Sequence, residues 1–264
     1  MRYTLKDKVA VITGASRGIG LAIARQLHKA GAVIYDISRH FEANKEMKMS
    51  FTADVNDNQT IETILKTIYQ KEGRIDIFVN NAGFGIAGAI ESAKPESIYA
   101  LINTNLAAVI NLSRIAVPYL KQSKGRLINI SSVGGIVPLP YQATYSAAKA
   151  GVEIFSKALA NEVRADGVQV MCIMPGDAQT TFTASRVIET ADEDDKAKKA
   201  ISKAEKEEQK GMTAEKVGAV IVKNIKKRKM PLRKTIGGIY KFIVFATRIV
   251  STKFLNFLVR KIYI

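Results

Sequence analysis

The sequence KVAVITGASRGIGLAIARQLHKAG, residues 8–31, places a short apolar run, a glycine-rich turn and an amphipathic stretch in that order. Residues 8–12 are mostly apolar and partly β-branched, which favours a β-strand. Apolar residues then recur at helical spacing, at Ile19, Ala22, Ile23 and Leu27. Glycine permits a tight turn and lets backbone N–H groups approach a phosphate at the start of a helix. The segment therefore predicts a strand, a phosphate-binding loop and a helix.

The alternation of strand and helix continues as far as about residue 176. Apolar runs predict further strands at 32–38, 50–55, 75–83, 125–132 and 169–176. Helical patterns lie at about 58–72, 95–120 and 143–165. Strands that alternate with helices of ten or more residues indicate crossover connections and a parallel sheet covered on both faces. We therefore expect a single doubly wound α/β domain.

Composition narrows the class of protein. The chain has 264 residues, of which 47% are hydrophobic and 24% charged, and this excludes wholesale disorder. One cysteine, Cys172, cannot form an internal disulfide, and no Cys/His cluster predicts a metal site. The first residues contain only a four-residue apolar run, so no export signal is expected, and we predict a cytoplasmic protein.

Positive charge is concentrated at the C-terminus. The net charge is +16, and residues 223–264 contain twelve Lys or Arg residues with no Asp or Glu. The chain before them carries only +4. We therefore expect a catalytic domain at 1–222 and a cationic amphipathic extension at 223–264. A charged stretch at 183–212 is either an exposed helix held by ion pairs or a mobile lid over a substrate.

The extension combines a basic start with an apolar, aromatic end. KNIKKRKMPLRK at 223–234 would bind anionic surfaces. Apolar residues follow, but they are interrupted by Lys241, Arg248, Lys253, Arg260 and Lys261, so no run approaches the ~18 residues of a membrane span. A helix of this kind can lie in the interface of an anionic membrane. Packing on its own domain or across a dimer is the alternative, and no nucleic-acid motif accompanies the charge.

Six motifs occur together in a familiar order. They are TGASRGIG at 13–20, Asp54-Val55, NNAG at 80–83, Asn105, Ser132 with Tyr145-x-x-x-Lys149, and Pro175-Gly176 with Thr180. Over roughly residues 6–181 the chain resembles the short-chain dehydrogenase/reductase family. The resemblance implies a Rossmann-type fold, an NAD(P)(H) cofactor, hydride transfer at a carbonyl or alcohol carbon of a small molecule, and a homodimer or homotetramer.

Tyr145 and Lys149 stand four residues apart, so a helix places both on one face. An adjacent ammonium favours the phenolate and lowers a tyrosine pKa. By resemblance, Tyr145 exchanges a proton with the substrate oxygen, Ser132 holds that oxygen, and Lys149 also binds the nicotinamide ribose. Asn105 would order water for a proton relay, although a helix asparagine satisfied by backbone is the alternative.

The resemblance also implies a cofactor site. Asp54 would bind the adenine amino group with Val55 against the ring, and Asn80 would lie beside the adenosine ribose. The remaining expected contacts are Gly14, Ser16, Arg17, Gly18, Ile19, Gly20, Ala82, Gly83, Pro175, Gly176, Ala178 and Thr180. A literal GxGxxG at Gly83, Gly85 and Gly88 has no acidic residue about twenty positions later, so we do not expect the pyrophosphate there.

The choice between NADP(H) and NAD(H) depends on the end of the second strand. An acid there binds the ribose 2′-hydroxyl of NAD, whereas arginine accommodates the 2′-phosphate of NADP. By resemblance the discriminating position is Ser38, followed by Arg39, and Arg17 adds a second cation. NADP(H) is therefore favoured, although a register shift of two residues would bring Asp36 to the ribose and reverse the preference.

Three functions remain open. The first is an NADP(H)-dependent oxidoreductase of a lipophilic carbonyl or alcohol, such as a fatty-acyl, steroid or retinoid-like compound, associated peripherally with membrane. The second is a soluble 3-oxoacyl-carrier-protein reductase, whose cations would contact an acidic carrier protein. The third is a non-catalytic cofactor-binding scaffold, against which the intact Ser132, Tyr145 and Lys149 argue.

Overall fold

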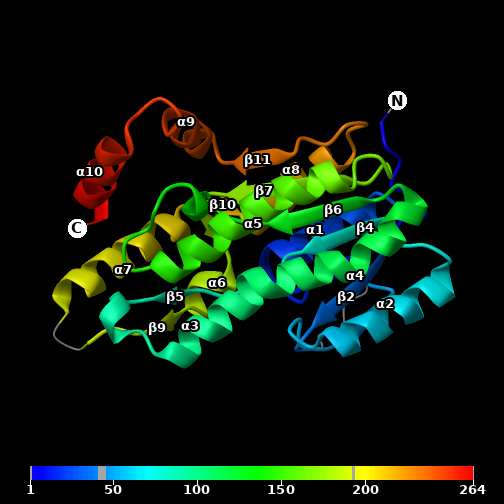
Figure 1. Cartoon of the computed structure of the whole chain (residues 1–264), viewed down its shortest axis with the longest axis horizontal. Helices are drawn as coiled ribbons and strands as arrows, with labels where there is room; N and C mark the ends of the chain where they lie inside the picture. The colour runs from blue at the N-terminus through cyan, green and yellow to red at the C-terminus, as the bar shows by residue number, and fades with distance from the viewer. Residues whose placement is uncertain (1, 41–45, 192–193, 264) are drawn as a thin grey trace.

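The computed structural model describes residues 2–40, 46–191 and 194–263. Seven parallel strands form one sheet in the order β11-β7-β6-β4-β1-β2-β3 (Figure 1). Their bounds are β1 (Val9–Thr13), β2 (Val33–Ser38), β3 (Met49–Thr52), β4 (Ile77–Asn80), β6 (Arg126–Ile130), β7 (Gln169–Pro175) and β11 (Arg233–Ile236). The strand order reverses at β1, which confirms the predicted doubly wound, Rossmann-type fold.

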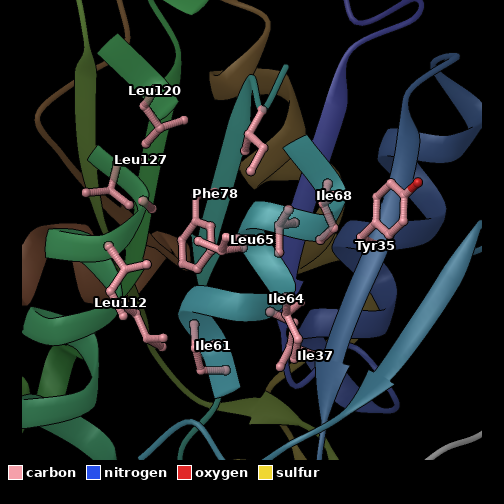
Figure 2. Close-up of a cluster of buried hydrophobic side chains, with 14 of the residues drawn as sticks. Tyr35, Ile37, Ile61, Ile64, Leu65, Ile68, Phe78, Leu112, Leu120 and Leu127 are labelled. Carbon is pink, nitrogen blue, oxygen red and sulfur yellow. The ribbon is translucent and has the colours of Figure 1, made fainter. Parts of the chain in front are cut away.

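Helices cover both faces of the sheet. On one face lie α1 (Gly18–Lys29) and α8 (Ala214–Ile225), whose apolar stripes pack on the strands through residues such as Ile23 and Ile221. The other face is covered by α2 (Asn58–Glu72), α4 (Ala108–Ser123) and α5 (Ala143–Glu162). Figure 2 shows Leu65 of α2 and Leu112 of α4 converging on Phe78 of β4. Burial of each such side chain contributes roughly 1.5–3 kcal/mol.

The helix predicted at 95–120 is interrupted. It consists of α3 (Pro95–Ile102), a π-helical turn at Asn103–Ala107 and then α4. Such turns are frequent at functional sites. The stretch 95–123 is the one part of the described chain that is long and apolar enough to cross a membrane, and α4 packs against β4 and β6 as a core helix does.

The expected boundary after residue 222 falls inside α8, so it is revised. The basic stretch that follows leads into β11, which pairs with β7 and completes the sheet. Among the described residues, two further helices follow it, α9 (Gly238–Ala246) and α10 (Thr252–Tyr263), and we call them the tail helices. Figure 1 shows them at the end of the chain, in red, where α10 contacts α7 (Asp195–Gln209).

The segment 178–213 spans the carboxyl ends of the strands and contains α7. Two small parallel sheets fix it: β8 (Ala178–Gln179) pairs with β10 (Met212–Thr213), and β9 (Val187–Ile188) pairs with β5 (Ile86–Ala87). The short helix α6 (Thr181–Ala184) lies between them. Two further short helices, Ile90–Ser92 and Val133–Gly135, follow β5 and β6.

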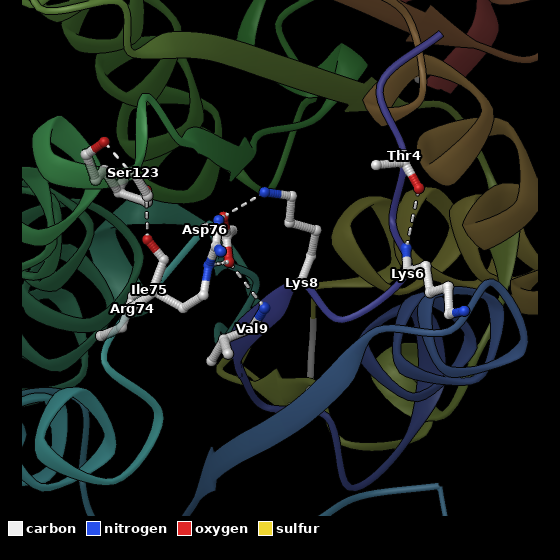
Figure 3. A network of polar contacts seen from close by, with 9 residues as sticks. Thr4, Lys6, Lys8, Val9, Arg74, Ile75, Asp76 and Ser123 are labelled. Carbon is white, nitrogen blue, oxygen red and sulfur yellow. Dashed lines mark hydrogen bonds and ion pairs between the residues drawn. The ribbon is translucent and has the colours of Figure 1, made fainter.

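A buried carboxylate joins the amino ends of β1 and β4. Asp76 accepts hydrogen bonds from Arg74 at 2.6 and 2.7 Å, from Lys8 Nζ at 3.0 Å and from the Val9 backbone at 3.0 Å (Figure 3). Burial raises the pKa of Asp76, but these hydrogen bonds outweigh burial and hold the pKa below its ordinary value. This network stabilises the end of the sheet opposite to the site.

Candidate active site

A cavity of about 740 Å³ opens at the carboxyl ends of the strands. Ligands of open α/β sheets bind at this edge. Four parts of the chain line the cavity: the glycine-rich loop, the ends of the strands, the 178–213 segment and the tail helices.

The glycine-rich loop is held tightly under the cavity. Gly14 and Gly18 adopt φ values of +68° and +58°, a region that favours glycine. A Cβ on Gly20 would lie 2.3 Å from the Gly14 carbonyl oxygen. From beneath, the Asp36 carboxylate accepts a hydrogen bond of 2.8 Å from the Ala15 N–H, and Asn81 Nδ2 donates to the carbonyls of residues 13 and 14 at 3.0 Å each.

The loop leads into a helix N-terminus suited to a pyrophosphate. α1 begins at Gly18, and Arg17 at its N-cap makes no side-chain capping bond. Its first backbone N–H groups and the helix dipole therefore favour an anion. The residues of this loop that line the cavity are Gly14, Ser16, Arg17, Gly18 and Ile19, whereas Gly20 lies in the packing beneath. The residues present thus fit the cofactor that the motifs imply.

Ser132, Tyr145 and Lys149 meet at one wall of the cavity. The Lys149 ammonium lies 5.8 Å from the centre of the Tyr145 ring and donates a 3.0 Å hydrogen bond to the Ile130 carbonyl. Ser132 forms a side-chain hydrogen bond with Tyr145, and its oxygen also accepts from the Gly134 N–H at 3.0 Å. Ser131 instead donates to the Lys149 carbonyl of α5 at 2.7 Å.

Burial controls the protonation of this group. It raises the pKa of Tyr145 to about 12, and the hydrogen bond with Ser132 opposes that rise. Burial also lowers the pKa of Lys149 to about 8. The expected lowering of the tyrosine pKa by Lys149 is not found, because burial dominates and the groups that act on Tyr145 are Ser132, Glu208 and Arg186. A protonated phenol is nevertheless the form that can donate to a carbonyl oxygen.

Asn105 does not line the cavity. It lies buried in the π-helical turn, where its Oδ1 accepts from the Phe84 N–H at 3.0 Å and its Nδ2 donates to the Phe84 carbonyl at 2.7 Å. Asn105 is thus the alternative considered above, a helix asparagine whose hydrogen-bonding atoms are both paired with backbone groups. Its role is to hold the loop that carries Gly83, whereas the water relay stays a prediction.

Most of the other expected cofactor contacts line the cavity, namely Ser38, Arg39, Asp54, Val55, Ala82, Gly83, Pro175, Gly176, Ala178 and Thr180. Asn80 is the exception, and its expected place is corrected. Its Nδ2 donates to Asn129 at 2.8 Å and to Ser113 at 3.1 Å inside the sheet layer. The neighbouring Asn81 lines the cavity instead, a place that the alternation of side chains along the strand could have indicated.

The other glycines of the literal GxGxxG have packing roles. A Cβ on Gly85 would lie 3.1 Å from the Phe182 ring, and one on Gly88 would overlap the Glu189 carbonyl. These two glycines therefore allow the chain around β5 to pack closely against Phe182 and Glu189, on either side of β9. Within the described residues, no group of three or more His, Cys, Asp or Glu side chains is arranged to hold a metal ion.

The tail helices contribute a wall that the sequence did not predict. The cavity residues of these helices and of the turn between them are Ile239, Tyr240, Phe242, Ile243, Ala246, Val250, Leu255, Leu258, Val259, Ile262 and Tyr263. The Tyr240 hydroxyl donates to the Asp177 carboxylate. The Tyr240 ring packs directly on Gly176, since a Cβ added to Gly176 would lie 2.0 Å from Tyr240 Cδ2. Apolar residues at helical spacing signal a buried face, but they do not say which surface covers it.

Comparison with known proteins agrees with this geometry. The family model for short chain dehydrogenases matches residues 8–210. A 3-ketodihydrosphingosine reductase of Bacteroides thetaiotaomicron is 35% identical over 248 residues, 92% of each chain. A 3-oxoacyl-acyl-carrier-protein reductase of Haemophilus influenzae is 39% identical over 188 residues, 68% of this chain and 77% of its own.

A solved structure extends the agreement to the fold. A short-chain dehydrogenase of Streptomyces avermitilis superposes with a TM-score of 0.80 at 27% identity and covers 91% of both chains. The glycine-rich loop, the Ser132, Tyr145 and Lys149 group, and these matches lead to one conclusion. The chain belongs to the short-chain dehydrogenase/reductase family, whose members are oxidoreductases acting on alcohol or carbonyl groups.

Proposed function

We propose that this chain is an NADP(H)-dependent reductase of a long-chain ketone, and that its substrate class is 3-ketodihydrosphingosine, a 2-amino-1-hydroxy-3-ketone with an alkyl chain. The observation that carries this proposal is the composition of the cavity. Polar groups that can protonate a carbonyl line one wall, and the mainly apolar tail helices line another. A ketone joined to a long alkyl chain matches both walls.

The reaction follows from the positions of three side chains. The glycine-rich loop and Lys149 would hold the cofactor, whose reduced nicotinamide would supply the hydride that the carbonyl carbon accepts. Ser132 orients the carbonyl oxygen, and Tyr145 gives that oxygen its proton, so that the ketone becomes a secondary alcohol. Lys149, fixed by the Ile130 carbonyl, would bind the nicotinamide ribose and stabilise the negative charge that the phenol acquires when it gives up its proton. The apolar wall excludes water from this step.

The extent of the sequence matches supports a lipid substrate. The last 42 residues are about one sixth of the chain, so the match of 92% to the 3-ketodihydrosphingosine reductase must include part of them. The match to the carrier-protein reductase covers only 68% of the chain. The longer match therefore favours the first relative's reaction over the second.

Two arginines support NADP(H) as the cofactor. Arg17 and Arg39 are exposed and line the same cavity as Ser38. Asp36, the competing acid, is 1% exposed and accepts hydrogen bonds from Ser38 at 2.7 Å and from the Ala15 N–H. The acid is occupied beneath the loop, which leaves the cationic side chains to meet a 2′-phosphate.

The outer face of the tail helices supports contact with an anionic membrane. Phe245, Ile249, Phe254 and Phe257 are 57%, 73%, 50% and 42% exposed and do not line the cavity. Basic residues of the same helices flank them. The helices contain nine and twelve residues, so each is about 14–18 Å long and too short for a hydrocarbon core of about 30 Å. They would lie in the interface, with the cavity beside the lipid.

Turnover tests the proposed reaction. NADPH oxidation by the purified chain is expected with 3-ketodihydrosphingosine, with a higher kcat/KM than for a 3-oxoacyl carrier protein. Tyr145→Phe is expected to lower kcat by at least about 100-fold while NADPH still binds, because the proton donor is lost. Preference for the carrier protein would support the soluble reductase, and NADPH binding without turnover of any carbonyl would support a scaffold.

Flotation tests the membrane contact separately. The wild-type chain is expected to float with phosphatidylglycerol vesicles, and a Phe245→Ser/Phe254→Ser variant is expected to remain below. Tyr99→Ser is the matched control, since Tyr99 is 69% exposed on α3. Self-association without flotation would assign the same face to a second copy of the chain.

A further inference from the structure

A buried arginine in the 178–213 segment has two nitrogen atoms without a hydrogen-bond partner among the described residues. Arg186 lies between α6 and β9, and its side chain has no exposed area. Its Nη2 pairs with the Glu208 carboxylate of α7, but Nε and Nη1 have no hydrogen-bond partner among the described residues. Buried donors in native proteins are almost always paired. A ligand oxygen is the partner that would complete this side chain.

The carboxylate beside Arg186 is held in place. One Glu208 oxygen pairs with Arg186, and the other accepts from the Thr183 hydroxyl. The Glu208 side chain is 17% exposed, and it lines the same cavity as Arg186 and Tyr145. Each carboxylate oxygen has a second lone pair, so Glu208 can still accept from a ligand.

The Arg186–Glu208 pair lies at the reacting end of the cavity. The ring of Phe182 is 5.8 Å from the Tyr145 ring and 5.9 Å from the guanidinium carbon of Arg186, so it neighbours both side chains. The charges of both Arg186 and Glu208 act on the Tyr145 phenol. A group bound by the pair would therefore be a close neighbour of the carbonyl that Tyr145 protonates.

Glu208 lies among other carboxylates of the cavity. Asp177 and Glu207 line the same cavity, and the charges of Glu207 and Glu208 both act on Asp177. The bases Lys149, Arg186 and Lys203 line it as well, so these acids and bases balance. An ammonium next to the ketone would therefore meet Glu208 as its specific counter-charge rather than a general field.

We propose that Arg186 and Glu208 form a head-group subsite that recognises the amino and hydroxyl groups next to the reacting ketone. The Glu208 carboxylate accepts from the substrate ammonium, and the free donors of Arg186 bind the hydroxyl oxygen. The alkyl chain then extends along the tail helices. This inference rests on the proposed function for the identity of the ketone, and it explains how an amino ketone is preferred over a plain one.

The test compares two ketones in three proteins. The kcat/KM ratio of 3-ketodihydrosphingosine to octadecan-3-one, which lacks both head groups, is measured for the wild type, Glu208→Gln and Glu205→Gln. Glu205 is on the same helix but does not line the cavity. Glu208→Gln is expected to lower the ratio about ten- to a hundredfold, the effect of one charged hydrogen bond, and Glu205→Gln to preserve it. An unchanged ratio in Glu208→Gln would overturn the proposal.

A binding measurement keeps the subsite testable if neither ketone is reduced. Calorimetry of dihydrosphingosine and octadecan-1-ol is then performed on the wild type and Glu208→Gln. Tighter binding of dihydrosphingosine that is lost in the variant supports the subsite even when the proposed reaction fails. Equal binding of the two lipids by the wild type overturns it. Arg186→Gln is a second variant, and its melting curve shows whether it folds. If Arg186→Gln does not fold, the result for Glu208→Gln alone decides the proposal.

Discussion

Replacing Tyr240 by Phe is expected to release α9 from the cavity without disturbing the sheet. The Tyr240 hydroxyl donates to Asp177, which follows Pro175-Gly176 at the end of β7. Its ring packs against Gly176, where no side chain intervenes. Phenylalanine keeps the ring and removes only the hydrogen bond. The variant therefore isolates the contact that fastens the tail helices to the strand ends.

The expected magnitude follows from the charge of the acceptor. A hydrogen bond to a charged group contributes about 1.5–3 kcal/mol, and the same range corresponds to about a 10- to 150-fold change in an equilibrium constant. Burial already raises the pKa of Asp177, and the Tyr240 hydroxyl lowers it. Loss of the hydroxyl is thus expected to raise the pKa of Asp177 further.

Hydrogen exchange measures this release directly. Amides of α9 are expected to exchange about 10- to 100-fold faster in Tyr240→Phe, while those of β6 and β7 keep their rates. The KM for a long-chain ketone is expected to rise, because α9 lines the cavity. Tyr99→Phe, an exposed tyrosine on α3, is the control.

Equal exchange in the two variants would refute the reasoning. It would mean that α9 is held by its apolar contacts, above all by Val244, which packs with Cys172 and Met174 of β7. The hydrogen bond would then orient Tyr240 without fastening the helix.

Three further variants test the site and the fold. The pKa of Lys149 is about 8, so its ammonium is lost as the pH rises through that value. The reduction rate is therefore expected to fall above pH 8. In Lys149→Met the residual rate is expected to lack this fall above pH 8. A wild-type profile flat to pH 10 would contradict this. Arg39→Ala is expected to lower the kcat/KM ratio of NADPH to NADH about ten- to a hundredfold, and an unchanged ratio would exclude a 2′-phosphate contact. Asp76→Asn is expected to destabilise the fold by about 3–5 kcal/mol and lower Tm by roughly 10 °C in calorimetry. Because folding lowers the pKa of Asp76, the difference in stability between wild type and variant is fully present above pH 3.8, the ordinary pKa of Asp, and shrinks as the pH falls through the folded-state pKa. A Tm within 1 °C of the wild type at pH 7 would show that the ion pairs do not stabilise the chain.

The sequence predicts those parts of the fold whose side chains repeat with a period. Six strands and the helices α1, α2, α4 and α5 follow from apolar runs and helical spacing, whereas α8 was not predicted. The glycine-rich loop follows from its place between β1 and α1. The seventh strand was missed because Arg233–Ile236 is four residues long and contains two cations, and only Ile236 is fully buried while the other three residues are half-buried. Its strand identity comes from pairing with β7, and pairing is a tertiary property.

Side-chain direction limits what could be predicted of the site. Ser132, Tyr145 and Lys149 were found because their spacing fixes a common face, but Asn80 and Asn81 are adjacent, and only the pleat of β4 decides which one meets the cavity. Arg186 carries no local signal, because a single arginine in a polar segment resembles any exposed one. Its burial arises only when α6, α7 and β5 come together around it.

Of the alternatives that the sequence left open for the tail, the structure shows packing on its own domain, and membrane contact stays a proposal. Val244 and Val259 are 4% and 6% exposed and pack inward, so the tail does fold on its own domain. Phe245 and Ile249 remain more than half exposed on the other side. Exposed apolar side chains on this side fit the membrane contact proposed above. The tail helices therefore line the cavity with one side, and on that proposal they would contact a membrane with the other.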